Sequence, residues 1–352
     1  MSKRVLVGIL NWGLGHATRS VPVIRRFMAQ GYEPVIASDG LALAWLRRTF
    51  PELPAEELPS STVIYPRRGG GLLRPWVGMQ LLAKARAFRA EKRLAARWAR
   101  RYGAEMIFSD NRPAFYVPGI RSVYMTHQLH VEAGIFSGAA TRLHRRLMRP
   151  FDEIWVPDFD GTPNLAGRLA HPAPPSLPVK YLGPLSRLHS RKPATVIDWL
   201  LVVSGPEQQR TQLENALIRH AALFDGRVTL VRGTLRQPRP KIPSHWQVVD
   251  LAGTKELERL AAQARLIVSR SGYSSVMDWF VLRRKAILIP TPGQSEQQYL
   301  ARHLEATGLY PFVPQNDLAR IAHIDLSHYF DYSPFKNTQT HDHPYAIQAT
   351  HS

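Results

Sequence analysis

Short apolar runs alternate with helical patterns along the chain, which is typical of strands and helices that follow one another. The first run, residues 5–10, leads into a glycine-rich turn and a helical pattern to about Gln30, and a second run follows Gly31. The apolar runs that we predict as strands are 5–10, 33–38, 106–109, 122–125, 153–156, 196–204, 227–232, 247–251, 266–269 and 286–290. This strand–helix–strand order predicts α/β architecture with parallel sheets.

Proline content predicts where the chain divides. Six prolines fall between residues 171 and 193, a composition typical of a connection between domains. A chain of 352 residues suits two domains. We therefore predict a first domain over residues 1–185, a second over 186–330, and a flexible polar tail over 331–352.

Composition narrows the chemistry. The chain has no cysteine, which excludes disulfides, thiolate metal sites and a cysteine nucleophile. It carries 46 Lys and Arg against 27 Asp and Glu, a net charge of +19. Residues 1–185 hold 26 of these basic residues and 13 of the acidic ones. This excess indicates an anionic partner, such as a phosphorylated ligand, acidic lipid or nucleic acid.

The apolar runs also bear on location. None approaches the roughly 20 residues that span a bilayer. The first apolar run is too short for a secretory signal, because Asn11 and a glycine-rich turn interrupt it. We therefore predict a cytoplasmic protein. The basic residues favour peripheral attachment to the inner face of the cytoplasmic membrane.

The glycine-rich turn holds the first candidate for chemistry. Gly13 and Gly15 precede His16 at the start of a helix, directly after the first strand. Glycine permits a tight turn and a close ligand, and a helix start favours negative charge. Because ligands of open α/β sheets bind at the carboxyl ends of strands, His16 is a candidate general base. The alternative is a tight turn whose histidine only packs or caps.

A second set of polar residues follows strands of the second half. The turn at Ser271 and Gly272 opens a helix, and its amides could bind a diphosphate. Asp278, two turns into that helix, could accept hydrogen bonds from ribose hydroxyls. Gln297 and Gln298 follow the next strand and could bind sugar hydroxyls, since each amide donates and accepts. The alternative is a solvent loop and a surface carboxylate.

These paired motifs resemble the GT-B glycosyltransferases, in particular the family-28-type branch, from Lys3 to about Tyr310. The resemblance implies two Rossmann-like, doubly wound domains that face a cleft. It implies that the second domain binds a nucleotide-sugar donor and that the first binds most of the acceptor. It also implies that neither a metal nor another cofactor is required.

The resemblance assigns roles to individual positions. His16 would be the catalytic base. The donor-binding residues would be Arg187, Ser204, Gly205, Ser271, Gly272, Asp278, Gln297 and Gln298. The acceptor-side residues would be Gly13, Gly15, Thr126, His127 and Gln128. Two positions depart from the family pattern: Ala301 stands where an asparagine is usual, and the loop after Ser204 is shortened.

Two patterns suggest metal binding. Asp158 and Asp160 form an Asp-x-Asp, and His127 and His130 are spaced as His-x-x-His. We expect turn-forming aspartates in the first case and loop contacts in the second, because no third ligand is evident.

The basic residues of the first domain cluster on a predicted helix at 79–101 and in a second group at 142–149. Basic side chains interleaved with apolar ones suit an anionic membrane surface. Within the first helix, Leu94 and Trp98 are expected to pack on the domain core. Nucleic acid ranks third among the anionic partners, behind the donor diphosphate and the membrane.

The sequence therefore favours an inverting, metal-independent transfer of a sugar, from a UDP-sugar to a hydroxyl of a lipid-linked or cell-envelope acceptor. Two alternatives stay open at this point. One is a nucleotide-sugar epimerase of the same fold, which needs no acceptor. The other is a non-enzymatic protein that binds RNA or another polyanion.

Overall fold

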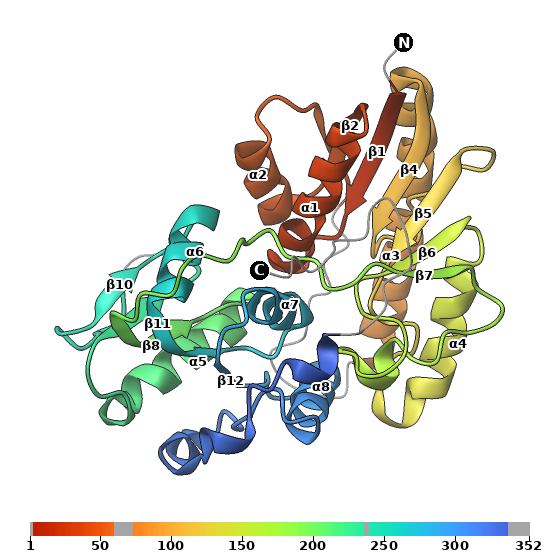
Figure 1. The fold of residues 1–352 in the computed structure, drawn as a ribbon. Helices are drawn as coiled ribbons and strands as arrows, with labels where there is room; N and C mark the ends of the chain where they lie inside the picture. Colours follow the sequence, from red (N-terminus) through yellow and green to blue (C-terminus); the bar gives the residue numbers. More distant parts are fainter. Residues whose placement is uncertain (1–2, 60–72, 236–238, 337–352) are drawn as a thin grey trace. The chain divides into compact units, whose positions relative to one another are not determined.

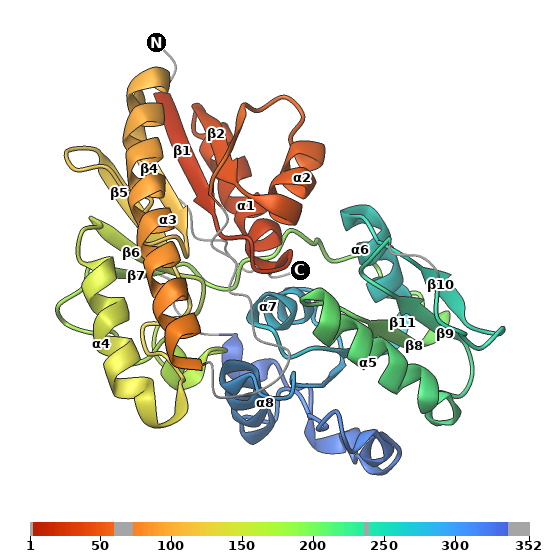
Figure 2. The ribbon, with the colours of Figure 1, turned by 180° about the vertical axis from the view of Figure 1, so that it is seen from behind.

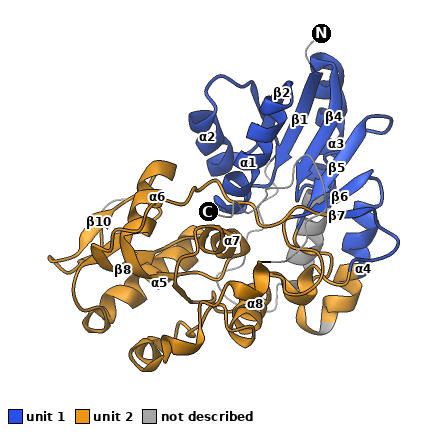
Figure 3. Cartoon of the chain, viewed as in Figure 1, with its two compact units in different colours: residues 1–126, 142–156, 173–180 blue, residues 127–141, 157–172, 181–352 orange. Residues whose placement is uncertain are grey.

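A computed structural model describes residues 3–59, 73–235 and 239–336, with backbone alone for 73–84 and 135 (Figure 1). The chain forms two compact units (Figure 3). Unit 1 comprises residues 1–126, 142–156 and 173–180, and unit 2 comprises residues 127–141, 157–172 and 181–352.

The first sheet has seven strands in the order β3-β2-β1-β4-β5-β6-β7. Its strands are β1 Lys3–Ile9, β2 Tyr32–Ser38, β3 Ala55–Glu57, β4 Ala104–Asp110, β5 Arg121–Met125, β6 Glu153–Val156 and β7 Val179–Tyr181. The pairs from β3 to β6 run parallel. The chain leaves β1 toward β2 and β3 on one side and later continues through β4 on the other. The order therefore reverses between β1 and β4.

Helices cover both faces of this sheet. The helices are α1 Gly15–Ala29, α2 Gly40–Thr49, α3 Leu73–Tyr102 and α4 Ser137–Met148. Figures 1 and 2 show α1 and α2 on one face and α3 on the other. Trp98 of α3 is buried in a cluster with Leu6 and Ile107, and Leu94 packs against that cluster. The predicted packing of Leu94 and Trp98 is thus confirmed, and the arginines at positions 86, 89, 93, 97 and 100 of α3 are exposed.

The second sheet has five parallel strands in the order β10-β9-β8-β11-β12. Its strands are β8 Ile197–Val202, β9 Val228–Val231, β10 Gln247–Val249, β11 Ala264–Ser269 and β12 Ala286–Leu288. The α-helices of this half are α5 Glu207–Arg219, α6 Thr254–Gln263, α7 Tyr273–Val281 and α8 Ser295–Ala306. The 3₁₀ helices of the chain are η1 Gly134–Phe136, η2 Gly167–Leu169, η3 Ala221–Leu223, η4 Leu318–His323, η5 Leu326–His328 and η6 Ser333–Phe335. Strand order reverses here between β8 and β11.

Unit boundaries differ from those expected from proline content. The last change from unit 1 to unit 2 follows residue 180, close to the predicted 185, but residues 127–141 and 157–172 also belong to unit 2. Side chains hold these segments there: the Tyr273 hydroxyl donates to the Pro157 carbonyl and the Tyr181 hydroxyl to the Ala170 carbonyl, each over 2.8 Å. Part of the proline-rich connection forms β7 rather than a linker.

The start of the predicted tail is folded. Phe335 is buried, and its ring packs against Phe159 and Phe280. The expectation of a flexible tail is therefore wrong for residues 331–336, because an aromatic side chain anchors them. Residues 337–352 of that tail lie outside the described residues.

Candidate active site

His16 lies at the point where the strand order of the first sheet reverses. The glycine turn after β1 carries His16 into the first turn of α1, and the neighbouring strand β4 ends on Asp110. Gly13 has a φ of +69°, which favours glycine, so the turn requires that residue. His16 Nδ1 lies 2.9 Å from Asp110 Oδ1, and 13% of the His16 side chain is exposed. This imidazole is thus both oriented and reachable.

Asp110 is a buried carboxylate that is bonded on all sides. Arg19 donates to both carboxylate oxygens, and the Ser20 hydroxyl donates to Oδ2 over 2.8 Å. Burial alone would raise the pKa of Asp110, but Arg19 and His16 hold that pKa well below its usual range. An ionised carboxylate can only accept, so Nδ1 of His16 carries the proton that lies between them. Nε2 of the neutral imidazole is then the basic nitrogen.

A second buried network holds the same turn. Arg112, just after β4, donates to Asp39 over 2.7 Å and to Glu91 over 2.9 Å. Asp39 also accepts from the Asn11 amide over 3.2 Å. Arg112 thereby joins the loops that follow β1, β2 and β4 to helix α3. These contacts fix the backbone that presents His16.

Sequence reasoning missed Asp110, Arg19 and Arg112. One signal could have identified Asp110. A carboxylate stands directly at the carboxyl end of the predicted strand 106–109, and in a parallel sheet such ends share one edge with the His16 turn. The pairing of Asp39 with Arg112 bridges 73 positions of sequence, and no local pattern indicates it.

The donor-side residues of unit 2 gather at its own reversal point. Ser204 and Gly205 follow β8, and Ser271 and Gly272 follow β11, the strand paired with β8. Gly205 is exposed and has a φ of +107°. Ser271 is buried, and its hydroxyl donates to the Gln297 carbonyl over 2.9 Å. Gly272 is the residue before helix α7, so the first amides of α7 follow it directly.

Asp278 and Arg187 lie near one another in unit 2. Asp278 accepts a hydrogen bond from Ser186, the neighbour of Arg187. Burial raises the pKa of Asp278 to about 6, against the opposing effects of Arg187 and Ser186. Arg187 is buried and donates to the hydroxyl of Thr254, the first residue of α6. A charged pair of this kind suits the ribose and phosphate groups of a nucleotide.

Gln297 and Gln298 differ in their contacts. Gln297 Oε1 accepts from the Thr291 amide over 3.0 Å, and its Nε2 donates to Gln294 over 2.6 Å. Within the residues that the structure describes, the Gln298 side chain forms no hydrogen bond. Gln297 therefore holds the loop before α8, and Gln298 keeps its amide for another partner.

Of the residues predicted on the acceptor side, the consecutive Thr126, His127 and Gln128 are divided between the two units. Thr126 is buried in unit 1, where its amide donates to the Trp155 carbonyl over 3.0 Å. His127 and Gln128 belong to unit 2, and both contact the carboxylate of Glu296 in the first turn of α8. These two residues thus lie beside the predicted sugar-binding pair of glutamines.

The two metal-like patterns have structural partners. The Asp158 carboxylate is buried and accepts from the amides of Leu165 and Ala166, each over 2.9 Å. His130 Nε2 lies 2.9 Å from the Pro172 carbonyl oxygen. Across residues 3–59, 73–235 and 239–336, no group of three or more histidine or acidic side chains is placed to hold a metal ion.

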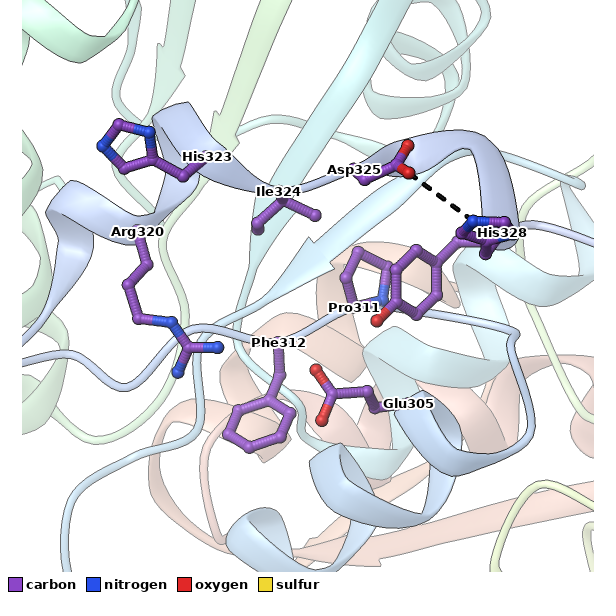
Figure 4. A pocket seen from close by; sticks show the side chains of 9 residues that line it. Glu305, Pro311, Phe312, Arg320, His323, Ile324, Asp325 and His328 are labelled. Atoms are coloured by element: carbon purple, nitrogen blue, oxygen red, sulfur yellow. Dashed lines mark ion pairs between the residues drawn. The ribbon is translucent and has the colours of Figure 1, made fainter.

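A surface pocket of about 330 Å³ lies at the other end of α8 (Figure 4). Glu305, Phe312 and Arg320 line it, and its rim carries an ion pair between Asp325 and His328 over 3.5 Å. None of the residues predicted for donor or acceptor lines this pocket. It is therefore distinct from the predicted donor site at the start of α8.

Comparison with known proteins agrees with this geometry. Residues 241–334 match the model of the glycosyltransferase family 28 C-terminal domain, a span that contains Ser271, Asp278 and the glutamine pair. A curated relative from a Methylobacterium species is 26% identical over 86% of this chain and 82% of its own length. It is a UDP-N-acetylglucosamine–N-acetylmuramyl-(pentapeptide) pyrophosphoryl-undecaprenol N-acetylglucosamine transferase.

Solved structures give the fold. MurG of Acinetobacter baumannii has a TM-score of 0.56 at 13% identity, covering 94% of this chain and 93% of its own. A Streptomyces glycosyltransferase complexed with thymidine diphosphate has a TM-score of 0.60 at 15% identity, covering 93% and 92%. The chain has the GT-B fold, and its residues 241–334 match the glycosyltransferase family 28 C-terminal domain.

These matches to glycosyltransferases bear on the functions that the sequence left open. The glycosyltransferase interpretation is confirmed, and neither the epimerase nor the polyanion-binding protein is favoured. The predicted fold class is confirmed as well, with a doubly wound parallel sheet in each unit.

Proposed function

We propose that this glycosyltransferase moves a sugar from a UDP-sugar to an acceptor hydroxyl, with inversion at the anomeric carbon and without a metal. The paired His16 and Asp110 carry the proposal, because a buried ionised carboxylate fixes the imidazole as a base. Unit 1 would activate the acceptor, and unit 2 would bind the donor.

In the proposed reaction, Nε2 of His16 removes the proton of the acceptor hydroxyl. The acceptor oxygen bonds to the anomeric carbon while the bond from that carbon to the diphosphate oxygen breaks. One displacement of this kind inverts the anomeric configuration. Asp110 stabilises the imidazolium that forms, since it stays ionised and bonded to Nδ1.

Donor binding is proposed for the reversal point of the second sheet. The turn from Ser271 to Tyr273 offers helix-start amides, which favour the negative charge that develops on the departing diphosphate. Arg187 would supply a positive charge, and Asp278 would accept from ribose hydroxyls. Amides and a guanidinium can together stabilise that charge without a metal ion. The choice of UDP follows the donor named for the Methylobacterium relative.

For the acceptor we propose a lipid-linked or cell-envelope molecule, because the named relative acts on an undecaprenol-linked substrate. The exposed face of α3 supports this choice, since arginines at positions 86, 89, 93, 97 and 100 are all exposed. Helix α4 and the turn before it add exposed Leu143 and Phe136, at 60% and 67%. No helix in the described part of the chain is long and apolar enough to cross a membrane.

We propose that the protein works in the cytoplasm, attached peripherally to the inner face of the cytoplasmic membrane. Basic and apolar side chains on the same helices suit the interface of anionic lipid. Residues 74–79, at the start of α3, combine Arg74 with the apolar Trp76 and Met79 and suit the same contact by sequence, but their side chains lie outside the described residues.

Donor binding can be tested by thermal unfolding with UDP, thymidine diphosphate and their sugars. Bound ligand raises the melting temperature, and UDP should raise it most. Asp278→Asn should weaken UDP binding about tenfold, the typical effect of losing a hydrogen bond to a charged group. Asp225→Asn, an exposed carboxylate of the same unit, is the matched control.

The pH dependence of binding adds a second readout. Because the pKa of Asp278 is about 6, its carboxylate forms as the pH rises through 6. The wild-type affinity for UDP should increase from pH 5 to pH 7 more than that of Asp278→Asn, in which only the phosphate of UDP changes its ionisation over this range. A wild-type protein that no nucleoside diphosphate stabilises would contradict the proposed donor.

A further inference from the structure

Glu296 is held by two side chains that lie far from it in sequence. Nε2 of His127 lies 2.8 Å from Glu296 Oε1, and the Gln128 amide donates to Oε2. Both oxygens of one carboxylate are therefore bonded by consecutive residues. The His127 side chain is 9% exposed, so this contact is shielded from water.

The same imidazole contacts the start of α7. His127 stacks on the Tyr273 ring with 4.3 Å between centroids and 6° between planes. Tyr273 is the first residue of α7 and directly follows Gly272. His127 thus touches the first turns of both helices that begin at the proposed donor site. We refer to His127, Gln128, Tyr273 and Glu296 as the Glu296 cluster.

Glu296 links this cluster to the two glutamines, because all three residues lie in the first turn of α8. Glu296 is the second residue of α8, and Gln297 and Gln298 follow it in the same turn. Successive side chains of an α-helix are about 100° apart around its axis, so holding Glu296 holds the rotation of this helix start and with it the Cα–Cβ directions of Gln297 and Gln298. Further contacts hold this helix: the Ser295 hydroxyl donates to the Glu132 carbonyl over 2.6 Å, and Tyr299 accepts from the Arg168 amide over 2.7 Å.

We propose that His127 and Gln128 are positioning residues for the donor sugar, because they hold Glu296 and so direct the Gln298 amide toward the sugar hydroxyls. The inference rests on the proposed function. It moves both residues from the acceptor side, where the family resemblance places them, to the donor side. In this role Glu296 acts as a support, since each of its oxygens is bonded to one of the two positioning residues.

Binding measurements separate the sugar from the nucleotide. Isothermal titration of the full chain with UDP, UDP-N-acetylglucosamine, UDP-glucose and UDP-galactose gives the ratio of the Kd for UDP to that for the preferred UDP-sugar. His127→Phe keeps a ring against Tyr273 and removes the bond to Glu296. Gln128→Leu removes the other bond. Each variant should raise the Kd for the preferred UDP-sugar about tenfold and leave that for UDP within about twofold.

Two further variants complete the design. Glu296→Gln keeps one acceptor oxygen, so it should raise the Kd for the preferred UDP-sugar by a smaller factor than either variant above. Glu305→Gln removes a carboxylate from the far end of α8, beside the pocket in Figure 4, and should change neither Kd. Thermal unfolding of each variant establishes whether it is folded. If His127→Phe does not fold, Glu296→Gln takes its place in the binding measurements.

The outcomes distinguish the inference from the proposed function. A wild-type protein that binds neither UDP nor a UDP-sugar would overturn the proposed function. A wild-type protein that prefers one UDP-sugar, with the same preference in His127→Phe and Gln128→Leu, would overturn the positioning role alone. If these variants change the Kd for the acceptor while the Kd values for UDP and the UDP-sugar stay constant, the two residues belong to the acceptor side.

Discussion

At the scale of single residues, the same kind of group behaves differently in the two units because of what surrounds it. Asp110 is buried among donors, and its pKa is well below the usual range. The burial of Asp278 outweighs the opposing effects of Arg187 and Ser186, and its pKa is raised to about 6. Asp110 therefore suits the role of a permanently charged partner of a base. Asp278 suits the role of a carboxylate that the hydroxyls of a bound ribose would stabilise by hydrogen bonds.

Asp110→Asn tests the residue-scale account of the base. The change removes the charge that orients and stabilises the imidazolium, so kcat should fall by roughly 10²- to 10⁴-fold. It also leaves the Arg19 guanidinium buried without its carboxylate, which should cost about 3–5 kcal/mol in the free energy of unfolding. Turnover assays and urea unfolding measure the two effects, with exposed Asp317→Asn as the control.

The same carboxylate determines part of the loss of folding stability at acid pH. The pKa of Asp110 is lower in the folded protein than in the unfolded chain, where it is about 3.9. Its contribution to stability is therefore complete above about pH 4 and is lost as the pH falls toward the folded value. Between pH 6 and pH 3, wild type should lose more stability than Asp110→Asn. Equal losses would show that the carboxylate is not held by charge.

At the scale of elements, the strands were predictable and several long-range contacts were not. The runs at 33–38 and 153–156 predict β2 and β6 almost to the residue, because buried parallel strands are continuous apolar runs. The short strands β3 and β7 were missed, since the charged residues within them leave no apolar run. Segment 127–141 was placed with the wrong neighbours because tertiary bonds, not its own pattern, attach it to unit 2.

In the candidate site too, some residues could be predicted from the sequence and their partners could not. Turns that follow strands are visible in sequence, so His16, Ser271 and the glutamine pair could be predicted. The partners of these residues come from distant strands. Asp110 is 94 positions from His16, and Glu296 is 169 positions from His127, so only the folded chain brings them together.

At the scale of the whole molecule, the net charge of +19 is uneven along the chain, because residues 1–185 hold 26 of the basic residues and 13 of the acidic ones. Positions 86, 89, 93, 97 and 100 recur every three or four residues and so share one face of α3. Opposite this face, Trp98 fills the core. The helix thus serves packing on one side and carries charge on the other.

Reversing two of these charges tests membrane attachment. Arg93→Glu with Arg97→Glu should weaken binding to vesicles of phosphatidylglycerol and phosphatidylcholine by at least about tenfold, since each basic residue near such a surface contributes about 1 kcal/mol. Raising the salt concentration should weaken wild-type binding as well. Sedimentation with vesicles measures both effects.

The control for vesicle binding carries the same change of charge elsewhere. Arg219→Glu with Arg259→Glu alters two exposed arginines of unit 2, on α5 and α6. This protein should bind the vesicles nearly as the wild type does. If both double variants bind equally well, the face of α3 is not the contact surface.

The central claim is a transfer from a UDP-sugar that depends on His16, and one assay measures it directly. Purified protein is incubated with EDTA, a UDP-sugar and a panel of polyprenyl-diphosphate-linked sugars, and UDP release and product configuration are followed. We expect UDP release that requires an acceptor, an inverted anomeric centre, and a loss of roughly 10²- to 10⁴-fold in His16→Ala, which should still bind UDP. Full turnover in His16→Ala, or conversion of the UDP-sugar to an isomer without any acceptor, would contradict the account.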